Sequence, residues 1–514
     1  MSPEIVPGWG HLKGESDKGA DSLVQEVMSG VLAVDTVGRR FQVEWDPLAP
    51  VTPLGQLVFF CQFLATSGLY ADWVAQCPLR YESPNAPAVG DVLGTSVLAI
   101  LSGAWRYAHV TALRGDQVNP RGLGMEKVVS EDSLRRAFKE MDAVGAMNWQ
   151  TQALQATYSP ALEQPWIADL DVTIKPVYGH QAGAEVGYNP HKPGRPSHAY
   201  HTVFLRTLRV ALDVEVHAGK EHAASHGLAN LWRLWDQWTP AQRPWLICGD
   251  AGYGNERAMS QSEERRQSYL FRQRSTKGVR QLIGLLERQG GWQSVCQDWS
   301  GTEGELQLSG WTRQRRCVVF RRPRQHPSPA GRLPLLDQAG VSVVSEPLYE
   351  YIVLVTNLKE NLLTLLHLYR QRADVENAYD ELKNQWGWGG FTTRDLLRCQ
   401  IAARLVAQVY NWWNLFVRCA DPARAREAIT SRPLLLFSVG RLIKGAGQTT
   451  LRLTSNHAEA AQAQTLLTQV SLFLSGLNNA AAEQLDAKAR WRRIWQRILA
   501  PYLQPATAKL AFSG

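Results

Sequence analysis

Two short apolar runs near the middle of the chain each carry an aspartate, and both are typical of buried β-strands. Asp171 lies inside the run Ile167–Ile174, where alternation places it with Asp169 on the face opposite the apolar side chains. Asp250 ends the run Trp245–Asp250. A carboxylate in an apolar strand is costly unless it is paired, hydrogen-bonded or bound to a metal. Ligands of open α/β sheets gather at the carboxyl ends of strands. The two aspartates therefore favour an α/β core with a polar site, although a cap or turn explains either one alone equally well.

The segments around these runs alternate strands with helices. Val203–Val216 favours two further strands, Gly227–Trp238 a helix, and Ser268–Phe271 a short strand. Long helices are predicted over Leu362–Asn384 and Asp395–Arg418. Strands followed by a helix and another strand are typical of an α/β core.

The chain of 514 residues is long enough for roughly three or four domains of ~100–200 residues each. We expect residues 161–274 and 359–420 to form the α/β core, interrupted by a β-rich insertion over 275–358. Residues 1–160 and 421–514 are expected to be mostly helical.

The N-terminal region contains one well-marked helix. Ser130 is placed to cap a helix with an acidic first turn and an apolar face. Two further helices are predicted over Pro53–Gln76 and Asp91–Arg106, after a hairpin over Val31–Trp45. These helices suit a helix-turn-helix reader of DNA or a helical bundle that does not contact DNA, and spacing alone does not separate the two.

Composition excludes several classes of protein. Lys and Arg number 55 against 47 Asp and Glu, which gives a net charge of +8 and weakly favours a polyanionic partner. The seven cysteines show no Cys-x2-Cys spacing, which argues against a disulfide framework or a zinc site. No apolar run reaches the ~18 residues of a membrane span. The N-terminus lacks the pattern of a signal peptide, so we expect a cytoplasmic protein.

A third group of polar residues falls on the first of the two long helices. Tyr369, Arg372, Glu376 and Lys383 lie within about 60° of one another on a continuous helix with ~100° per residue. Asp380 shares this stripe and competes with Glu376 as the functional carboxylate. A salt-bridged, solvated helix face also explains the pattern.

Taken together, two strand aspartates and a helix glutamate form the oxygen ligand set that a pair of Mg²⁺ ions requires. Two such ions ~3.5–4 Å apart can activate a nucleophile and stabilise a leaving oxygen in phosphoryl transfer. The hydroxyl and cationic side chains beside Glu376 would then hold phosphate oxygens.

Three blocks of the sequence resemble those of the DDE transposases of bacterial insertion sequences. They are Asp171-Val172-Thr173, Gly249-Asp250-Ala251-Gly252-Tyr253-Gly254, and Tyr369-x2-Arg372-x3-Glu376-x6-Lys383. The third is similar to the signature of the group conventionally numbered four, with every interval matched. The Asp250 block and the stretch from Gly179 to Pro190 are similar to the branch numbered thirteen-eighty. The blocks cover about half of the chain.

The resemblance implies an α/β fold with an RNase H-like mixed sheet, a β-rich insertion and flanking helical regions. It implies that Asp171, Asp250 and Glu376 are catalytic and bind two Mg²⁺ (or Mn²⁺) ions. It implies that Tyr369, Arg372 and Lys383 hold DNA phosphates near the cut end.

The resemblance also implies a reaction and its partners. The protein would cut double-stranded DNA at terminal inverted repeats and join the ends to target DNA, by cut-and-paste with a hairpin intermediate. A homodimer is expected, because two ends need two active sites. In relatives the insertion handles a flipped base; Trp292, Trp299 and Trp311 are candidates here, although core packing explains any one of them better.

Three basic features would suit a path for DNA. Lys192 and Arg195 lie in a loop expected close to Asp171, which either contacts DNA or is a simple turn. A basic amphipathic segment from Lys488 to Ile498 could bind DNA, a second subunit or the protein itself. Six arginines around one strand-like stretch suit a ribbon along a phosphate backbone or a charged edge strand. They are Arg313, Arg315, Arg316, Arg321, Arg322 and Arg324.

Two other functions stay open. One is a metal-independent hydrolase in which two of the carboxylates act as acid and base, but it leaves Arg372 and Lys383 unexplained. The other is a DNA-binding protein derived from a transposase without catalysis, and the intact acidic trio speaks against it.

Overall fold

A mixed sheet of ten strands forms the centre of the computed structural model, which describes residues 32–46, 48–189, 192–324, 349–445, 447–455, 457–479 and 485–503. The strand order is β10-β11-β12-β13-β9-β8-β4-β6-β5, and β7 pairs with β6 off this path. β8 runs parallel to β4 and β9, whereas the other pairs in this sheet are antiparallel. The predicted α/β class is confirmed. The strands are β4 (Ile167–Pro176), β5 (Glu185–Val186), β6 (Pro196–Leu205), β7 (Val210–Ala218), β8 (Leu246–Gly249), β9 (Tyr269–Arg272), β10 (Gln293–Cys296), β11 (Trp299–Leu306), β12 (Arg315–Pro323) and β13 (Tyr349–Thr356).

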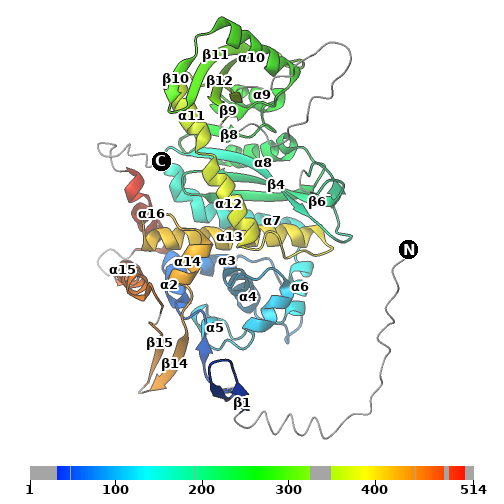
Figure 1. Ribbon diagram of the computed structural model, residues 1–514. Helices are drawn as coiled ribbons and strands as arrows, with labels where there is room; N and C mark the ends of the chain where they lie inside the picture. Colours follow the sequence, from blue (N-terminus) through cyan, green and yellow to red (C-terminus); the bar gives the residue numbers. More distant parts are fainter. Residues whose placement is uncertain are drawn as a thin grey trace, which may run out of the picture.

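Helices cover both faces of the sheet. On one face, α11 (Leu362–Arg370) packs its leucines against Leu246, Cys248 and Leu354. On the other face, α7 (Ala143–Tyr158) and α8 (Ala223–Gln237) pack against β7 and β6. Two further helices, α9 (Glu256–Glu264) and α10 (Lys277–Gln289), lie towards the β10–β12 end of the molecule (Figure 1).

Helix α13 (Leu396–Ala420) joins the sheet to the helical half of the molecule (Figure 1). It packs against β7 on one side and against N-terminal and C-terminal helices on the other, and almost its whole surface is buried. This half contains α2 (Leu57–Ser67), α3 (Leu69–Ala75), α4 (Val89–Leu101), α5 (Asn119–Gly122), α6 (Glu131–Glu140), α14 (Ala428–Leu435), α15 (Ala460–Asn479) and α16 (Ala487–Leu503). Helix α12 (Ala373–Asn384) lies on the sheet, where Tyr379 packs against Phe204 of β6. Short 3₁₀ turns are present at Tyr107–Leu113, Ser159–Glu163 and Pro240–Gln242.

Several local predictions are confirmed. Ser130 caps α6, since its hydroxyl accepts a hydrogen bond from the backbone N–H of Ser133 at 3.2 Å. The predicted N-terminal hairpin is present as β1 (Leu32–Asp35) and β2 (Arg40–Val43). The basic C-terminal segment is helix α16, which packs on the protein's own body, because Trp491 and Trp495 are buried and donate to backbone carbonyls of α7.

Two predicted continuous helices are broken. The segment Pro53–Gln76 forms α2 and α3, which meet at a 71° bend where Gly68 has a φ of 75°. The segment Leu362–Asn384 forms α11 and α12, separated at Gln371 and Arg372. Helical periodicity does not reveal such breaks, because both halves keep apolar residues at helical spacing.

Two β-sheet features differ from the sequence predictions of a β-rich insertion and a mostly helical C-terminal region. The strands of residues 275–358 extend the core sheet through the pairing of β13 with β9, and α10 precedes them. The C-terminal region contains a hairpin of β14 (Gly440–Gly445) and β15 (Gln448–Leu453), and β14 also pairs with β3 (Val51–Thr52).

Across the described ranges, no single helix is both long and apolar enough to cross a membrane. The bent pair α2 and α3 meets that test of length and composition when taken together.

Candidate active site

Asp171 and Asp250 lie side by side on neighbouring strands. The parallel register of β4 and β8 pairs Leu170 with Gly249, so the two aspartates are the next residues along each strand. Adjacent strands are ~4.8 Å apart. The site therefore stands at the carboxyl end of β8, where a sheet of this kind presents ligand-binding groups.

The glycines around Asp250 allow the chain to turn sharply at this point. A Cβ on Gly249 would lie 2.8 Å from Cβ of Tyr253, and a Cβ on Gly254 would lie 2.2 Å from the carbonyl oxygen of Arg272. The backbone N–H of Gly252 donates to Oδ1 of Asp250 at 2.9 Å. The Gly252 N–H thus holds the Asp250 carboxylate in place just after β8.

The three predicted acids line one cavity of about 600 Å³. Asp171 and Asp250 form its sheet side, and Glu376 comes from the first turn of α12. Asp380 does not line this cavity; it is exposed and accepts a hydrogen bond from Asn384 at 2.7 Å. The full lining is Asp171, Val172, Thr173, Asp250, Ala251, Arg272, Tyr369, Arg372, Glu376 and Tyr379.

Glu376 stands apart from the aspartate pair within this cavity. Among the described residues, no group of three His, Cys, Asp or Glu side chains lies close enough together to hold one metal ion. The structure thus brings the two aspartates together and places the glutamate in the lining of the same cavity. The three carboxylates are not close enough to bind one metal ion together.

Arg372 occupies the break between α11 and α12 and is only 4% exposed. Its Nε donates to Oδ1 of Asp169 at 2.9 Å, and its Nη2 donates to Oδ2 of Asp171 at 3.1 Å. Because of the break, Tyr369 and Arg372 do not share one continuous helical stripe with Glu376 and Lys383. Tyr369, Arg372 and Glu376 nevertheless line the cavity. Lys383 does not line it.

Asp169 binds Arg372 and a second arginine, Arg206. It is fully buried, and its Oδ2 accepts from Nε of Arg206 at 2.8 Å while Oδ1 accepts from Arg372. Arg206 also donates to the carbonyl oxygen of Leu368 in α11 at 2.5 Å. Alternation along the strand had placed Asp169 beside Asp171, but no sequence signal indicated that two distant arginines meet there.

The electrostatics of the pair follow from burial. Burial raises the pKa of Asp171 to about 7, against the lowering effect of Arg372, and the charges of Asp250 and Asp169 raise it further. Burial lowers the pKa of Lys383, while the charges of Asp171 and Asp380 oppose that change. The cavity therefore holds a buried carboxylate, Asp171, whose charged form a cation would stabilise.

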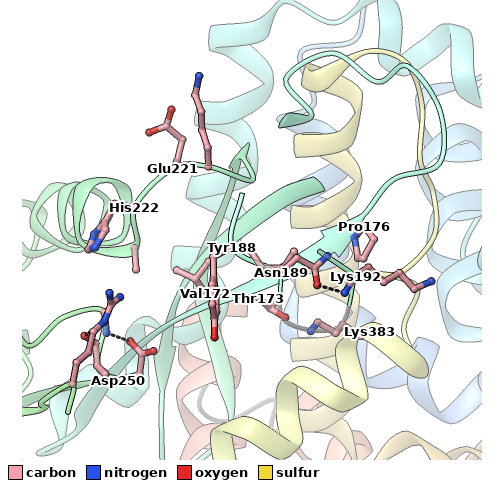
Figure 2. Close-up of a pocket in the computed structure, with 16 residues that line it drawn as sticks. Val172, Thr173, Pro176, Tyr188, Asn189, Lys192, Glu221, His222, Asp250 and Lys383 are labelled. Atoms are coloured by element: carbon pink, nitrogen blue, oxygen red, sulfur yellow. Dashed lines mark hydrogen bonds between the residues drawn. The ribbon is translucent and has the colours of Figure 1, made fainter. Parts of the chain in front are cut away.

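A second, larger cavity of about 840 Å³ adjoins the first, and both are lined by Val172, Thr173, Asp250 and Ala251. Figure 2 shows Lys383 and Lys192 on one side of this cavity and Asp250 and His222 on the other. Among its other lining residues are Lys220, Arg274 and the strongly exposed Tyr188. Two of the predicted DNA contacts, Lys192 and Lys383, thus line the cavity that adjoins that of the aspartates.

Arg195 lies close to this cavity without lining it. Its guanidinium is 4.7 Å from the ring centre of Tyr178, an exposed side chain that also contacts Lys192.

The predicted arginine ribbon is largely neutralised within the protein. Each of five arginines pairs with a glutamate: Arg313 and Arg315 with Glu263, Arg316 with Glu303, Arg321 with Glu287, and Arg322 with Glu350. Arg315 also pairs with Glu256, and its side chain is only 3% exposed, so it has almost no surface to offer a phosphate. These partners come from other strands and helices, which is why the sequence did not reveal them.

The candidate base-handling tryptophans have structural neighbours. Trp299 and Trp311 are buried, and arginines of the ribbon lie over their rings. Trp292 is partly buried, and Arg321 lies 4.0 Å from its ring centre.

Comparison with protein families gives one decisive match. A family model described as the group 1 transposase DDE domain matches residues 74–473. The chain belongs to this family. The matched range contains all three acidic residues of the cavity and runs from α3 into α15. The DDE domain of this transposase therefore comprises both the sheet and most of the helical half.

Other comparisons add little. No curated protein matches the transposase sequence. Among solved structures, the piggyBac transposase in a synaptic complex with hairpin DNA aligns with a TM-score of 0.38 and 10% identity, over 87% of this chain and 85% of that chain.

Proposed function

We propose that this protein cuts DNA at the ends of a transposon and joins those ends to target DNA, with Asp171, Asp250 and Glu376 as ligands of two Mg²⁺ or Mn²⁺ ions. One observation carries the proposal. Three carboxylates from distant parts of the chain line a single cavity in a member of the DDE transposase family.

The chemistry of the aspartate pair supports a divalent cation. Its donors are carboxylate oxygens, which Mg²⁺ and Mn²⁺ prefer. Burial and the neighbouring charge of Asp250 raise the pKa of Asp171 and so disfavour its charged form, and a bound cation would offset both effects. Glu376 would add a third carboxylate from α12. When bound, such ions activate the attacking oxygen and stabilise the leaving oxygen of a phosphodiester.

The cationic side chains would hold the DNA strand. Arg372 lines the cavity and would contribute positive charge where negative charge develops on the phosphate, since phosphoryl transfer depends mainly on positioning and electrostatics. The Tyr369 hydroxyl could donate to a phosphate oxygen. Lys383 faces the adjoining cavity and would hold the strand beyond the reacting phosphate.

The adjoining cavity offers a path for that strand. Lys192 and Arg274 line it together with Lys383, and Figure 2 shows the two lysines on the same side. The guanidinium of Arg195 lies over the ring of Tyr178, which Lys192 also contacts. We expect the ribbon residues Arg313, Arg316, Arg321 and Arg322 to contribute less, because their glutamate partners compete with phosphate. Arg315 is not part of this proposed path.

The course of the reaction rests on the sequence resemblance. We propose cut-and-paste transposition through an RNase H-like core, with a hairpin at the transposon end, on double-stranded DNA that carries terminal inverted repeats. A homodimer is proposed because the two ends require two active sites.

Cleavage of a supercoiled plasmid tests the proposal. The plasmid would carry the DNA that flanks the coding region on both sides, and reactions would contain Mg²⁺, Mn²⁺ or EDTA. We expect nicked and linear products with either metal and none with EDTA. Activity that persists in EDTA would indicate a metal-independent hydrolase instead.

Matched variants separate catalysis from binding. Asp250→Asn should abolish cleavage and keep binding to the flanking DNA, whereas Asp380→Asn should cleave almost normally. A native protein that binds this DNA but never cuts it would indicate a non-catalytic DNA-binding protein.

A further inference from the structure

The hairpin of β14 and β15 projects from the helical half of the molecule, away from the β10–β12 end (Figure 1). Its base is fixed by the pairing of Gly440 with Thr52 in β3 and by a bridge between Leu54 and Ser438. A Cβ on Gly55 would lie 2.7 Å from the carbonyl oxygen of Ser438. The base of the hairpin is therefore packed closely against the body, while its outer part is exposed.

The hairpin carries three exposed cations and no acidic residue. They are Arg441, Lys444 and Arg452, and the sequence from Gly440 to Leu453 contains neither Asp nor Glu. Within the described part of the chain, none of the three makes an ion pair or hydrogen bond. The contrast with β12 is informative, because five arginines around that strand each have a glutamate partner.

The register places two of these cations directly opposite each other. Arg441 pairs across the hairpin with Arg452. Like charges at opposed positions destabilise a strand pair, and no carboxylate on the hairpin compensates them. A bound polyanion would offset the repulsion between these cations and so stabilise the hairpin.

We propose that the β14–β15 hairpin binds the phosphate backbone of double-stranded DNA, at a place separate from the catalytic cavity. The inference rests on the proposed function, which brings duplex DNA to this protein. Cationic and hydroxyl side chains are the usual ligands of DNA phosphates, and Thr449 and Thr450 add two exposed hydroxyls to the three cations. The major groove of DNA is wide enough to admit a two-stranded ribbon.

The position of the hairpin defines what it would do. The catalytic cavity lies on the main sheet under α11 and α12, whereas the hairpin is attached to β3 and lies at the far end of the helical half (Figure 1). The hairpin would therefore hold a stretch of duplex other than the one being cut and would add affinity without a role in the chemistry.

Binding of a labelled duplex of arbitrary sequence by the full-length protein tests this inference. In the triple variant Arg441→Gln, Lys444→Gln, Arg452→Gln, affinity at low salt should fall about tenfold or more. The slope of log affinity against log salt should become shallower by about 2 to 3, because each phosphate contact contributes ~0.9. The double variant Arg441→Lys, Arg452→Lys keeps its charges and should bind like the native protein.

A control of equal charge change identifies the surface. Lys277, Arg280 and Arg288 are exposed on α10, at the other end of the molecule (Figure 1). Their replacement by Gln should change affinity and slope far less than the hairpin variant does. Equal losses in the two triple variants would mean that net charge alone matters and would overturn the inference.

A stability measurement guards against misfolding. Arg452→Thr removes the repulsion from Arg441, so in low salt without DNA its Tm should not fall and should rise slightly, while its DNA affinity drops. Unchanged DNA affinity in the hairpin variants, with normal binding by the native protein, would overturn this inference alone. A native protein that does not bind duplex at all would overturn the proposed function as well.

Discussion

Nη2 of Arg372 donates a hydrogen bond to Oδ2 of Asp171 at 3.1 Å, inside the cavity that Asp250 and Glu376 also line. The carboxylate proposed to bind a metal is thus also paired with a guanidinium. Asp169 holds the other side of the same guanidinium at 2.9 Å. This chain of contacts ties the break between α11 and α12 to strand β4, and it makes several effects of substitution predictable.

Replacement of Asp171 by Asn should stabilise the metal-free fold at alkaline pH. Burial raises the pKa of Asp171 to about 7, above its usual value, so the folded state holds a proton that the unfolded state has lost between about pH 4 and 7. Native stability should therefore fall as pH rises through this window. In EDTA at pH 8, Asp171→Asn should therefore have a higher Tm than the native protein, and the difference should shrink as the pH is lowered towards 4.

Addition of Mg²⁺ provides the check on this prediction. It should raise the Tm of the native protein and leave that of Asp171→Asn almost unchanged, while the variant is inactive in cleavage. An Asp171→Asn protein that is less stable than native at pH 8 in EDTA would contradict the assigned electrostatics.

Replacement of Asp169 by Ala should damage the fold. Asp169 is fully buried and is the shared partner of Arg206 and Arg372, so its removal leaves two buried guanidiniums without this counter-charge. We expect a loss of about 3–5 kcal/mol in the free energy of unfolding, measured by urea denaturation. Asp380→Ala, at an exposed site, should change it by less than about 0.5 kcal/mol.

The choice of third carboxylate is tested on α12 itself. Glu376→Gln should abolish cleavage, because Glu376 lines the cavity, and should keep binding to transposon-end DNA. Asp380→Asn should be much milder, since Asp380 does not line the cavity and accepts a hydrogen bond from Asn384. A dead Asp380→Asn enzyme with an active Glu376→Gln enzyme would reassign the ligand.

Replacement of Lys383 by Ala should weaken the hold on DNA more than the hold on metal. Lys383 lines the larger cavity, as Asp250 does, but not the cavity of the three acids. We expect a raised KM for transposon-end DNA with an unchanged dependence on Mn²⁺ concentration, read from cleavage rates at varied DNA and metal. An unaltered KM would remove Lys383 from the DNA path.

Local sequence was sufficient for many features of this protein. Apolar runs of strand length placed β4 and β8 together with their aspartates, and a serine before an acidic turn marked the start of α6. Such features depend on neighbours a few residues apart, so they can be derived without knowing the fold. The signature that joins Tyr369, Arg372, Glu376 and Lys383 likewise depends on spacing alone. It indicated a DDE transposase, which the family match shows, while the group that this signature marks stays a prediction.

Long-range packing alone decided the rest. The break at Arg372 arises because buried Asp169 and Asp171 lie where that guanidinium can reach both, some two hundred residues away along the chain. The arginines around β12 pair with glutamates from α9, α10 and neighbouring strands, whereas those of the β14–β15 hairpin pair with none among the residues that the structure describes. Whether a charged side chain has an oppositely charged partner depends on which distant residues fold beside it. The spacing of residues along the sequence does not determine such contacts.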